Sequence, residues 1–233
     1  MFPEVGKATL RVLGRLGHDV EFPAEQTCCG QMHVNTGYQK QALPLVERFA
    51  EVFAPYDAIV APSGSCVGSV RHQHAMIAKR FGSAGLVDQV EAVATKTYEL
   101  SEFLVDVLGV SDVGAYFPHR VTYHPTCHSL RMLRVGDKPI KLLRAVDALE
   151  LVELPAADQC CGFGGTFAVK FGEISSRLAD NKCQHIVTNG AETVVLGDLG
   201  CMLNIEGRLR RRGDATRVMH VAEVLAGDLP PGA

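Results

Sequence analysis

The sequence predicts an α/β protein in which two repeats are related by a pseudo-twofold axis. Each repeat is expected to hold a small, mainly parallel sheet flanked by helices, with cysteine-bearing loops at the strand ends. Two pairs of matching segments predict this. Cys28-Cys29-Gly30 returns 132 residues later as Cys160-Cys161-Gly162, and the stretch from Ala58 to Cys66 matches that from Thr193 to Cys201 at an offset of 135.

The bulk properties fit two such units. The chain has 233 residues, of which 47% are hydrophobic and 21% charged, as is ordinary for a globular protein. We expect residues 1–112 to form the first repeat and residues 113–233 the second. A net charge of −3 and a pI near 6.3 give no reason to expect a nucleic-acid partner. We find neither a secretory leader nor an apolar run long enough for an integral membrane segment, so we expect a cytoplasmic protein.

In the first repeat, Pro3 and a stripe of apolar residues spaced three or four apart predict a helix that ends at Gly17. Residues 19–23 are expected to form a short strand before Cys28. A capping box of Thr36 and Gln39 is expected to open a second helix. Residues 58–61 predict a buried strand, residues 83–96 show only weak periodicity, and residues 100–108 predict a helix.

The second repeat shows the same order of elements. Residues 120–123 predict a strand, a helix follows around residues 142–149, and residues 151–154 predict the next strand. A long helix is expected to carry one apolar face, and residues 193–196 predict a last strand. The apolar face of that helix is expected to comprise Phe167, Phe171, Ile174 and Leu178.

Four cysteines of the second repeat each follow a predicted strand. They are Cys127, Cys160, Cys161 and Cys201. Loops at the carboxyl ends of parallel strands converge on one edge, so these thiols are expected to meet there. Four thiolates suit a cubane iron–sulfur cluster, and a tetrahedral zinc ion could use them as well. The helix that starts near Thr166 would stabilise a negatively charged thiolate centre.

The first repeat offers a smaller set of thiols, namely Cys28, Cys29 and Cys66. No counterpart of the strand and cysteine at residues 121–127 precedes Pro3, so we expect this site to lack one ligand and to hold zinc or an incomplete cluster. The eighth cysteine, Cys183, is expected to be an inert buried residue. The histidines that flank the motifs are expected to cap or to support the ligands rather than to bind metal themselves; they are His33, His124 and His128.

Longer motifs resemble a known family. Thr27-Cys28-Cys29-Gly30-Gln31, His124-Pro125-Thr126-Cys127-His128 and Cys160-Cys161-Gly162-Phe163-Gly164-Gly165 resemble the lactate utilisation protein A family. That family belongs to the Cys-Cys-Gly domain iron–sulfur proteins, which include the cysteine-rich subunit of heterodisulfide reductase. The broader family often carries Cys-x-x-Cys downstream, where this chain has Ser63 and Asp198 in the first positions.

The resemblance implies a function. It implies a non-catalytic, iron–sulfur electron-transfer subunit of a system that oxidises L-lactate to pyruvate, with other iron–sulfur subunits as partners and a 4Fe-4S cluster in the second repeat. Two alternatives stay open. One is a heterodisulfide reductase-like subunit that acts on thiols and disulfides, and the other is a zinc-stabilised structural module. The sequence contains no catalytic dyad, phosphate loop or dinucleotide fingerprint.

Overall fold

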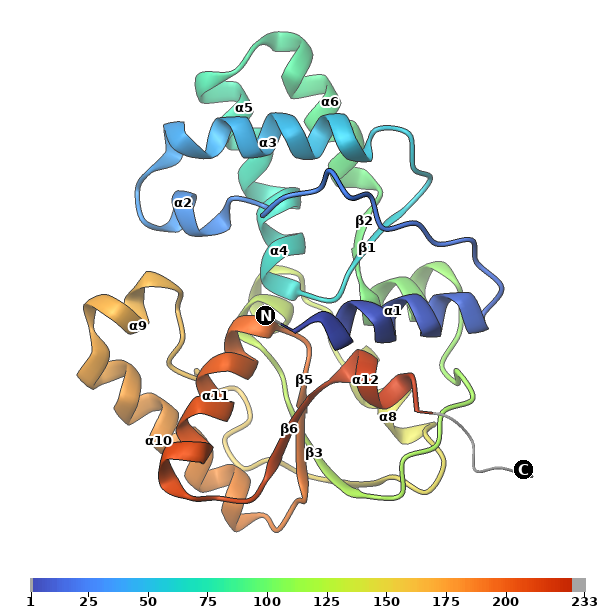
Figure 1. The fold of residues 1–233 in the computed structure, drawn as a ribbon, viewed down its shortest axis with the longest axis vertical. Helices are drawn as coiled ribbons and strands as arrows, with labels where there is room; N and C mark the ends of the chain where they lie inside the picture. The colour runs from blue at the N-terminus through green and yellow to red at the C-terminus, as the bar shows by residue number, and fades with distance from the viewer. Residues whose placement is uncertain (1, 228–233) are drawn as a thin grey trace.

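A computed structural model describes residues 2–227, so the outer limits of the two predicted repeats, residues 1 and 233, lie outside the described part. It is an α/β protein whose strands are all parallel, and they form two sheets (Figure 1). The larger sheet has the order β4-β3-β5-β6 and the smaller sheet pairs β1 with β2. The strands are β1 Ile59–Ala61, β2 Thr97–Glu99, β3 Arg120–His124, β4 Glu150–Val152, β5 Thr193–Leu196 and β6 Arg217–His220.

The larger sheet is buried at its centre. Every residue of β5 is buried, and only Arg120 of β3 is exposed. The two strands pair in register, with Val121 opposite Thr193 and His124 opposite Leu196. Strands that are buried along almost their whole length are typical of a parallel sheet that is covered on both faces. The carboxyl ends of β3 and β5 therefore reach the same edge of the sheet.

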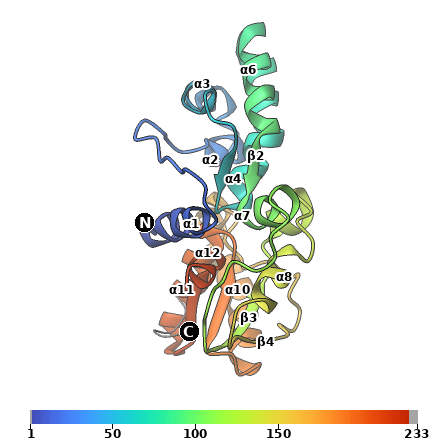
Figure 2. The ribbon, with the colours of Figure 1, turned by 90° about the vertical axis from the view of Figure 1, so that its right-hand side faces the viewer.

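Helices from both ends of the chain cover the larger sheet. The N-terminal helix α1, Pro3–Arg15, packs against the C-terminal helix α12, Val221–Leu225, and Figure 2 shows them side by side. Val5, Val12 and Leu225 share one core cluster with the strands. The core thus combines residues from both predicted repeats, and the boundary between residues 112 and 113 stays a prediction. The core is also covered by α8 Lys138–Arg144, α10 Gly172–Thr188 and α11 Leu199–Arg212. Helix α9, Thr166–Lys170, buries no residue and packs against α10.

The smaller sheet carries a helical layer with a core of its own (top of Figure 1). Val46, Ile77 and Val90 pack there between three helices. The elements of this part are α2 Gln31–Asn35, α3 Gln39–Phe53, α4 Gly64–Gly68, the π-helix η1 Ser69–His74, α5 Ala75–Phe81 and α6 Ala84–Thr95. The two parts are joined through α7 Leu100–Glu102, followed by the π-helices η2 Phe103–Val107 and η3 His128–Met132.

Several local predictions were wrong. Residues 19–23 form no strand, and Thr36 bonds back to the carbonyls of Met32 and His33 instead of capping α3. The expected long helix is broken at Phe171, whose φ of −125° and ψ of 51° leave the helical region. Because of this break, α10 buries Ser175, Ala179 and Ile186 and leaves Phe171 and Ile174 exposed. Strands β2 and β6 were not predicted.

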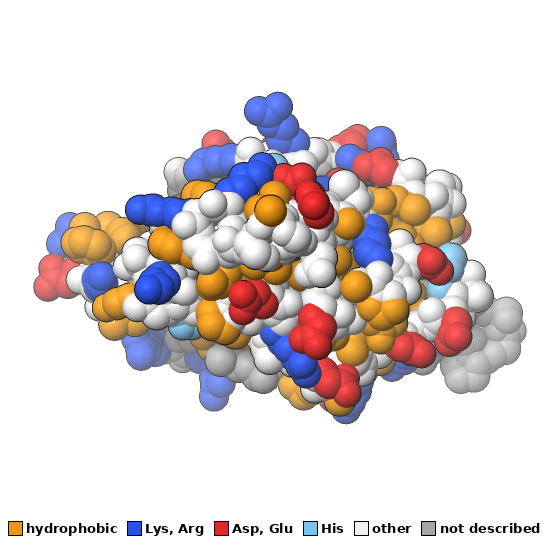
Figure 3. Space-filling view, turned by 90° about the horizontal axis from the view of Figure 1, so that it is seen from above, with side chains coloured by type: hydrophobic (Ala, Val, Ile, Leu, Met, Phe, Trp, Pro, Cys, Tyr) orange, Lys and Arg blue, Asp and Glu red, His pale blue; other side chains and the backbone are white. Residues whose placement is uncertain are grey.

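The surface is mixed in charge on the face that Figure 3 displays. Seen from the end that carries α5 and α6, Lys and Arg side chains lie among Asp and Glu side chains. Such interspersed charges do not form the basic stripe that nucleic-acid-binding proteins use. Within the described residues, no helix combines the length and the apolar character that a membrane span requires.

Candidate metal centres

The four cysteines of the second repeat lie at one edge of the larger sheet. Cys127 follows β3 at the start of η3, and Cys201 lies in the first turn of α11, after β5. Cys160 and Cys161 lie in the loop that connects β4 with α9. We call this set the second-repeat centre. The parallel topology brings together thiols that are far apart in the sequence.

The thiols of the second-repeat centre contact one another in a row. Cys161 Sγ lies 3.1 Å from Cys201 Sγ. The thiol of Cys160 accepts hydrogen bonds from Cys127 on one side and Cys161 on the other, and both contacts lower the pKa of Cys160 to about 2. The same contacts raise the pKa of Cys127 and of Cys161. Cys160 is therefore the thiolate of the row and its neighbours are donors.

A glycine turn shapes this row. The backbone N–H of Gly162 donates to Cys160 Sγ at 3.3 Å, which further favours the thiolate. Gly162 has a φ of +86°, and a Cβ at this position would lie 2.5 Å from the carbonyl oxygen of Ser175. Only glycine fits such a backbone so close to a neighbouring chain segment. Asn204 of α11 holds the other side of the turn, because its Nδ2 donates to the carbonyl of Cys161 at 2.8 Å.

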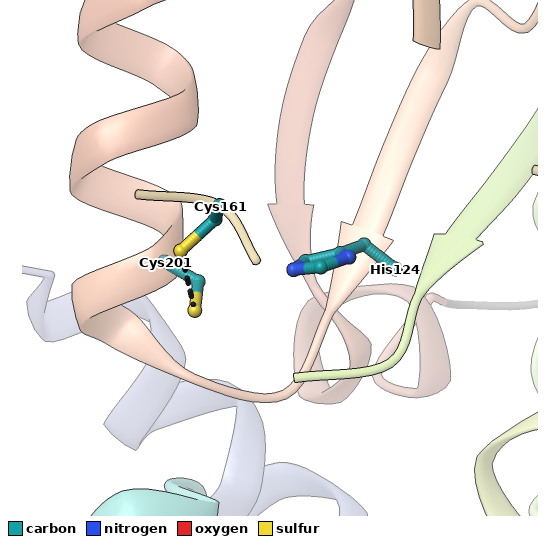
Figure 4. Close-up of side chains that lie close together, drawn as sticks. All are labelled: His124, Cys161 and Cys201. Carbon is teal, nitrogen blue, oxygen red and sulfur yellow. Dashed lines mark hydrogen bonds between the residues drawn. The ribbon is translucent and has the colours of Figure 1, made fainter. Parts of the chain in front are cut away.

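His124 faces the same thiols. It ends β3 and is fully buried, and one of its ring nitrogens lies within 4.8 Å of the sulfurs of Cys161 and Cys201 (Figure 4). Burial, together with the nearby Lys182 ammonium, lowers the pKa of His124 to about 3, so the imidazole is neutral. A neutral imidazole and thiolates are the donors that zinc and iron bind in proteins.

Lys182 is a buried cation next to the second-repeat centre. Its side chain comes from α10 and is fully buried, and its Nζ donates to the carbonyls of Ala156 and Ala157 at 2.8 and 3.1 Å. Burial lowers the pKa of Lys182, whereas Cys161 and the other nearby thiols act in the opposite direction. A cation in this place favours negative charge on the thiols and ties down the loop that carries them.

The first-repeat centre consists of Cys28, Cys29 and Cys66. Cys29 is buried between the other two thiols and hydrogen-bonds to both, which raises the pKa of Cys29. The hydrogen bond from Cys29 lowers the pKa of Cys28 to about 5, and the N–H of Gly30, 3.5 Å from Cys28 Sγ, acts in the same direction. The pKa of Cys66 is lowered in the same way by Cys29. The structure thus brings together each predicted set of thiols, and Cys183 lies apart in the core, as its helical position predicted.

Polar contacts connect the surroundings of the two centres. The N–H of Ser65, next to Cys66, donates to Asp198 Oδ2 at 3.0 Å, and the N–H of Gly64 donates to the carbonyl of Gly197 at 3.3 Å. On the other side, Gln31 Nε2 lies 3.0 Å from the carbonyl of Ser65 and 3.1 Å from His128 Nε2. His128 therefore supports the loops, as predicted, and His124 is the flanking histidine that faces thiols.

Three further residues at these sites were not predicted from the sequence. Lys182 carries no signal, because lysine is normally a surface residue and almost never fully buried without a partner. Asn204 lies on α11 outside the quoted motifs, and Gln31 ends the first Cys-Cys-Gly motif but was not itself predicted as a site residue. The roles of all three depend on loops that the fold brings near them.

The donor set fits a metal or an iron–sulfur cluster in its chemistry. The thiolates are soft ligands, and within residues 2–227 neither ring nitrogen of the buried His124 makes a hydrogen bond of normal geometry. The distances between the sulfur atoms must increase when a metal binds. Two thiolates on one tetrahedral metal lie about 3.8 Å apart, given metal–sulfur bonds of about 2.3 Å. The 3.1 Å between Cys161 and Cys201 is shorter, so these side chains must move apart around any metal, and further apart around a cluster of several irons.

Known proteins match nearly the whole chain. A family described as cysteine-rich domain matches residues 1–71 and 121–206, which places one segment on each repeat. The chain is 46% identical over 225 residues to lactate utilization protein A of Oceanobacillus iheyensis, with 97% of this chain and 91% of that protein covered. It is 49% identical over 224 residues to lactate utilization protein A of Geobacillus kaustophilus, with 96% and 92% covered. The matched segments contain all seven cysteines of the two centres.

Proposed function

The chain belongs to the cysteine-rich domain family and, within it, to the lactate utilization protein A family, and from this premise we propose that it is an iron–sulfur electron-transfer subunit of an L-lactate-oxidising system. The reaction that this system carries out is the oxidation of L-lactate to pyruvate. The eight thiols, none of which forms a disulfide, are suited to the reducing cytoplasm.

One observation supports the proposal above all others. Cys127, Cys160, Cys161 and Cys201 come from three separate segments of the chain and meet in one row of contacts. Four thiols that meet in this way would also be enough for a structural zinc site. However, Lys182 adds a buried positive charge, and Gly162 adds an N–H that points at a sulfur. Such contacts stabilise a thiolate centre of high negative charge and adjust its potential.

The residues of the second-repeat centre would have defined tasks. The four thiolates would hold a 4Fe-4S cluster, which when bound takes up and releases single electrons. Lys182 and the N–H of Gly162 would offset its negative charge. Asn204 would fix the loop against α11, since it bonds the carbonyl of Cys161. In the first-repeat centre, Cys28, Cys29 and Cys66 would hold zinc or an incomplete cluster.

An electron carrier needs protein partners that perform the two-electron chemistry. Cys127 and Cys160 are only partly buried, so the second-repeat centre lies close to the surface. Exposed apolar side chains follow it on α9 and the start of α10, namely Val169, which is 84% exposed, and Phe171 and Ile174, each 53% exposed. Exposed apolar groups of this kind favour protein–protein contact. We therefore expect other iron–sulfur subunits to dock on this side.

A thiol–disulfide function is the second candidate. The contact between Cys161 and Cys201, at 3.1 Å, and the thiolate of Cys160 are also what a thiol exchange site requires. In that case, the two thiols of Cys161 and Cys201 would be oxidised to a disulfide while they reduce a substrate disulfide to two thiols, without a cluster.

Growth experiments test the proposed function. Deletion of the gene should abolish or slow growth on L-lactate and leave growth on glucose intact, because only lactate oxidation needs the carrier. Complementation with wild-type protein or with Cys183→Ala should restore growth, whereas Cys160→Ser should not. The purified protein alone should not oxidise lactate. Normal growth of the deletion strain on lactate, in the absence of a second lactate-oxidising pathway, would refute the proposal.

A further inference from the structure

His124 stands out among the buried histidines of residues 2–227. His74 Nε2 bonds the carbonyl of Cys29 at 2.8 Å, and His220 Nδ1 accepts the N–H of Ala222 at 3.0 Å. In contrast, neither ring nitrogen of His124 makes a hydrogen bond of normal geometry, although the side chain is fully buried and the carbonyl of Ala157 lies near enough to act on its pKa. A buried polar group without a hydrogen bond destabilises the folded protein. Buried groups of this kind call for an explanation, and an ion is one of the accepted ones.

The surroundings of His124 indicate what that partner is. The ring extends from the end of β3 toward Cys161 and Cys201, which come from the loop after β4 and from α11 (Figure 4). The three potential ligand atoms all lie within 4.8 Å of one another, and all three residues are buried. One tetrahedral metal ion with bonds of about 2.0–2.3 Å holds its ligand atoms about 3.5–3.8 Å apart, so side-chain adjustments alone bring these three atoms onto one ion.

We propose that His124 is a metal ligand, which with the thiolates of Cys161 and Cys201 forms a mixed imidazole–thiolate site for a tetrahedral cation of the iron, cobalt or zinc type. The identification of the bound metal as iron rests on the proposed function, whereas the ligand role of His124 does not. In the iron–sulfur form, His124 would be a nitrogen ligand in addition to the four thiolates. A neutral imidazole adds no negative charge to the centre, so it favours a higher reduction potential than a fifth thiolate would.

Cobalt(II) tests the ligand role directly. The metal-free protein is titrated with cobalt(II) without oxygen and followed by absorption and by proton NMR. An imidazole bound to cobalt(II) gives a strongly shifted N–H resonance that exchanges with solvent. We expect this resonance in the wild-type protein and in His128→Ala, whose ring also flanks the cysteines but bonds Gln31. We expect its loss in His124→Asn, with cobalt(II) binding weakened at least about tenfold.

Pulsed EPR of the reduced iron–sulfur form provides the second readout. We expect strong nitrogen coupling in wild-type protein and in His128→Ala, and none in His124→Asn or in His124→Cys, where a thiolate replaces the imidazole. A wild-type protein that lacks the shifted resonance with cobalt(II) would overturn the inference, as would a resonance that persists in His124→Asn. The first outcome concerns wild-type protein alone, so it can be read even if a variant fails to fold. The second outcome can occur only in a variant that folds and binds cobalt(II).

The outcomes separate this inference from the proposed function. An iron–sulfur cluster without nitrogen coupling, together with no shifted resonance, would leave the electron-transfer function intact and refute the ligand role. Conversely, cobalt(II) bound through His124 in a protein that takes up no iron–sulfur cluster would support the ligand role and refute the proposed function. A protein that binds no cobalt(II) at all would refute the ligand role.

Discussion

The hydroxyl of Ser63 donates a hydrogen bond to Asp198 over 3.4 Å, although the two residues lie 135 positions apart in the sequence. They are equivalent residues of the two repeats. Ser63 accepts the N–H of Cys66 and caps α4, while Asp198 accepts the N–H of Gly200 and caps α11. The two repeats therefore carry helix caps at equivalent positions, and these caps meet between the repeats.

We predict that Asp198→Ala destabilises the protein. The carboxylate is 4% exposed and accepts both the N–H of Gly200 at 3.1 Å and the N–H of Ser65 at 3.0 Å. Loss of a helix cap and of a buried acceptor should lower the free energy of unfolding by about 1–3 kcal/mol. Urea unfolding of metal-free protein measures this. Asp88→Ala, at an exposed position of α6, serves as the control and should change stability by less than about 0.5 kcal/mol. Equal stability of Asp198→Ala and wild type would contradict the role of this cap.

Cys28 should react as a thiolate in metal-free protein at mildly acidic pH. The hydrogen bond from Cys29 and the N–H of Gly30 lower the pKa of Cys28 to about 5. A lowered pKa means that the thiolate is already present at about pH 6–7 and is lost only as the pH falls through about 5. Mass spectrometry of alkylated peptides between about pH 4 and 9 measures the midpoint.

Cys183 and unfolded protein are the controls for this experiment. Burial raises the pKa of Cys183 to about 11, so it should stay unmodified in folded protein. In urea, the midpoint for Cys28 should move to about 8.5, the value of an ordinary cysteine. A midpoint near 8.5 in the folded, metal-free protein would show that the contacts of Cys28 do not stabilise its thiolate.

Lys182 should raise the reduction potential of the second-repeat centre. Its ammonium is fully buried close to the thiols and favours the added electron. We expect Lys182→Met to lower the potential by about 59 mV or more, which is a tenfold change for a one-electron couple. A redox titration followed by EPR measures it. Lys170→Met, at an exposed position of α9, should leave the potential unchanged. If Lys182→Met binds the cluster and keeps the wild-type potential, Lys182 only supports the loop through Ala156 and Ala157.

The repeated elements of the fold were easier to predict than the local ones. Buried strands such as β5 and the spacing of the Cys-Cys-Gly motifs were readable, because a parallel sheet covered on both faces gives continuous apolar runs. The break at Phe171 was missed, since the helical stripe of residues 167–178 continues through it. The edge strands β2 and β6 were missed because Thr97–Glu99 and Arg217–His220 mix polar and apolar residues.

The cysteine sets were predicted from their positions after strands, and the contacts of Cys161 with Cys201 agree with that expectation. The rest of the site depends on tertiary structure. A lysine in a helical sequence is normally a surface residue, and only the loop at Ala156 and Ala157 accounts for the burial of Lys182. His124 was predicted to support the ligands, because its place beside the sulfurs of Cys161 and Cys201 is visible only in the fold.

The most direct test of the electron-transfer account is the metal content of protein purified without oxygen. We expect a brown protein with broad visible absorption that bleaches on reduction, with iron and acid-labile sulfide in equal amounts. Cys160→Ser and Cys161→Ser should lose most of the iron, whereas Cys183→Ala should retain it. A colourless wild-type protein that contains zinc and no sulfide would contradict the account and support the structural module.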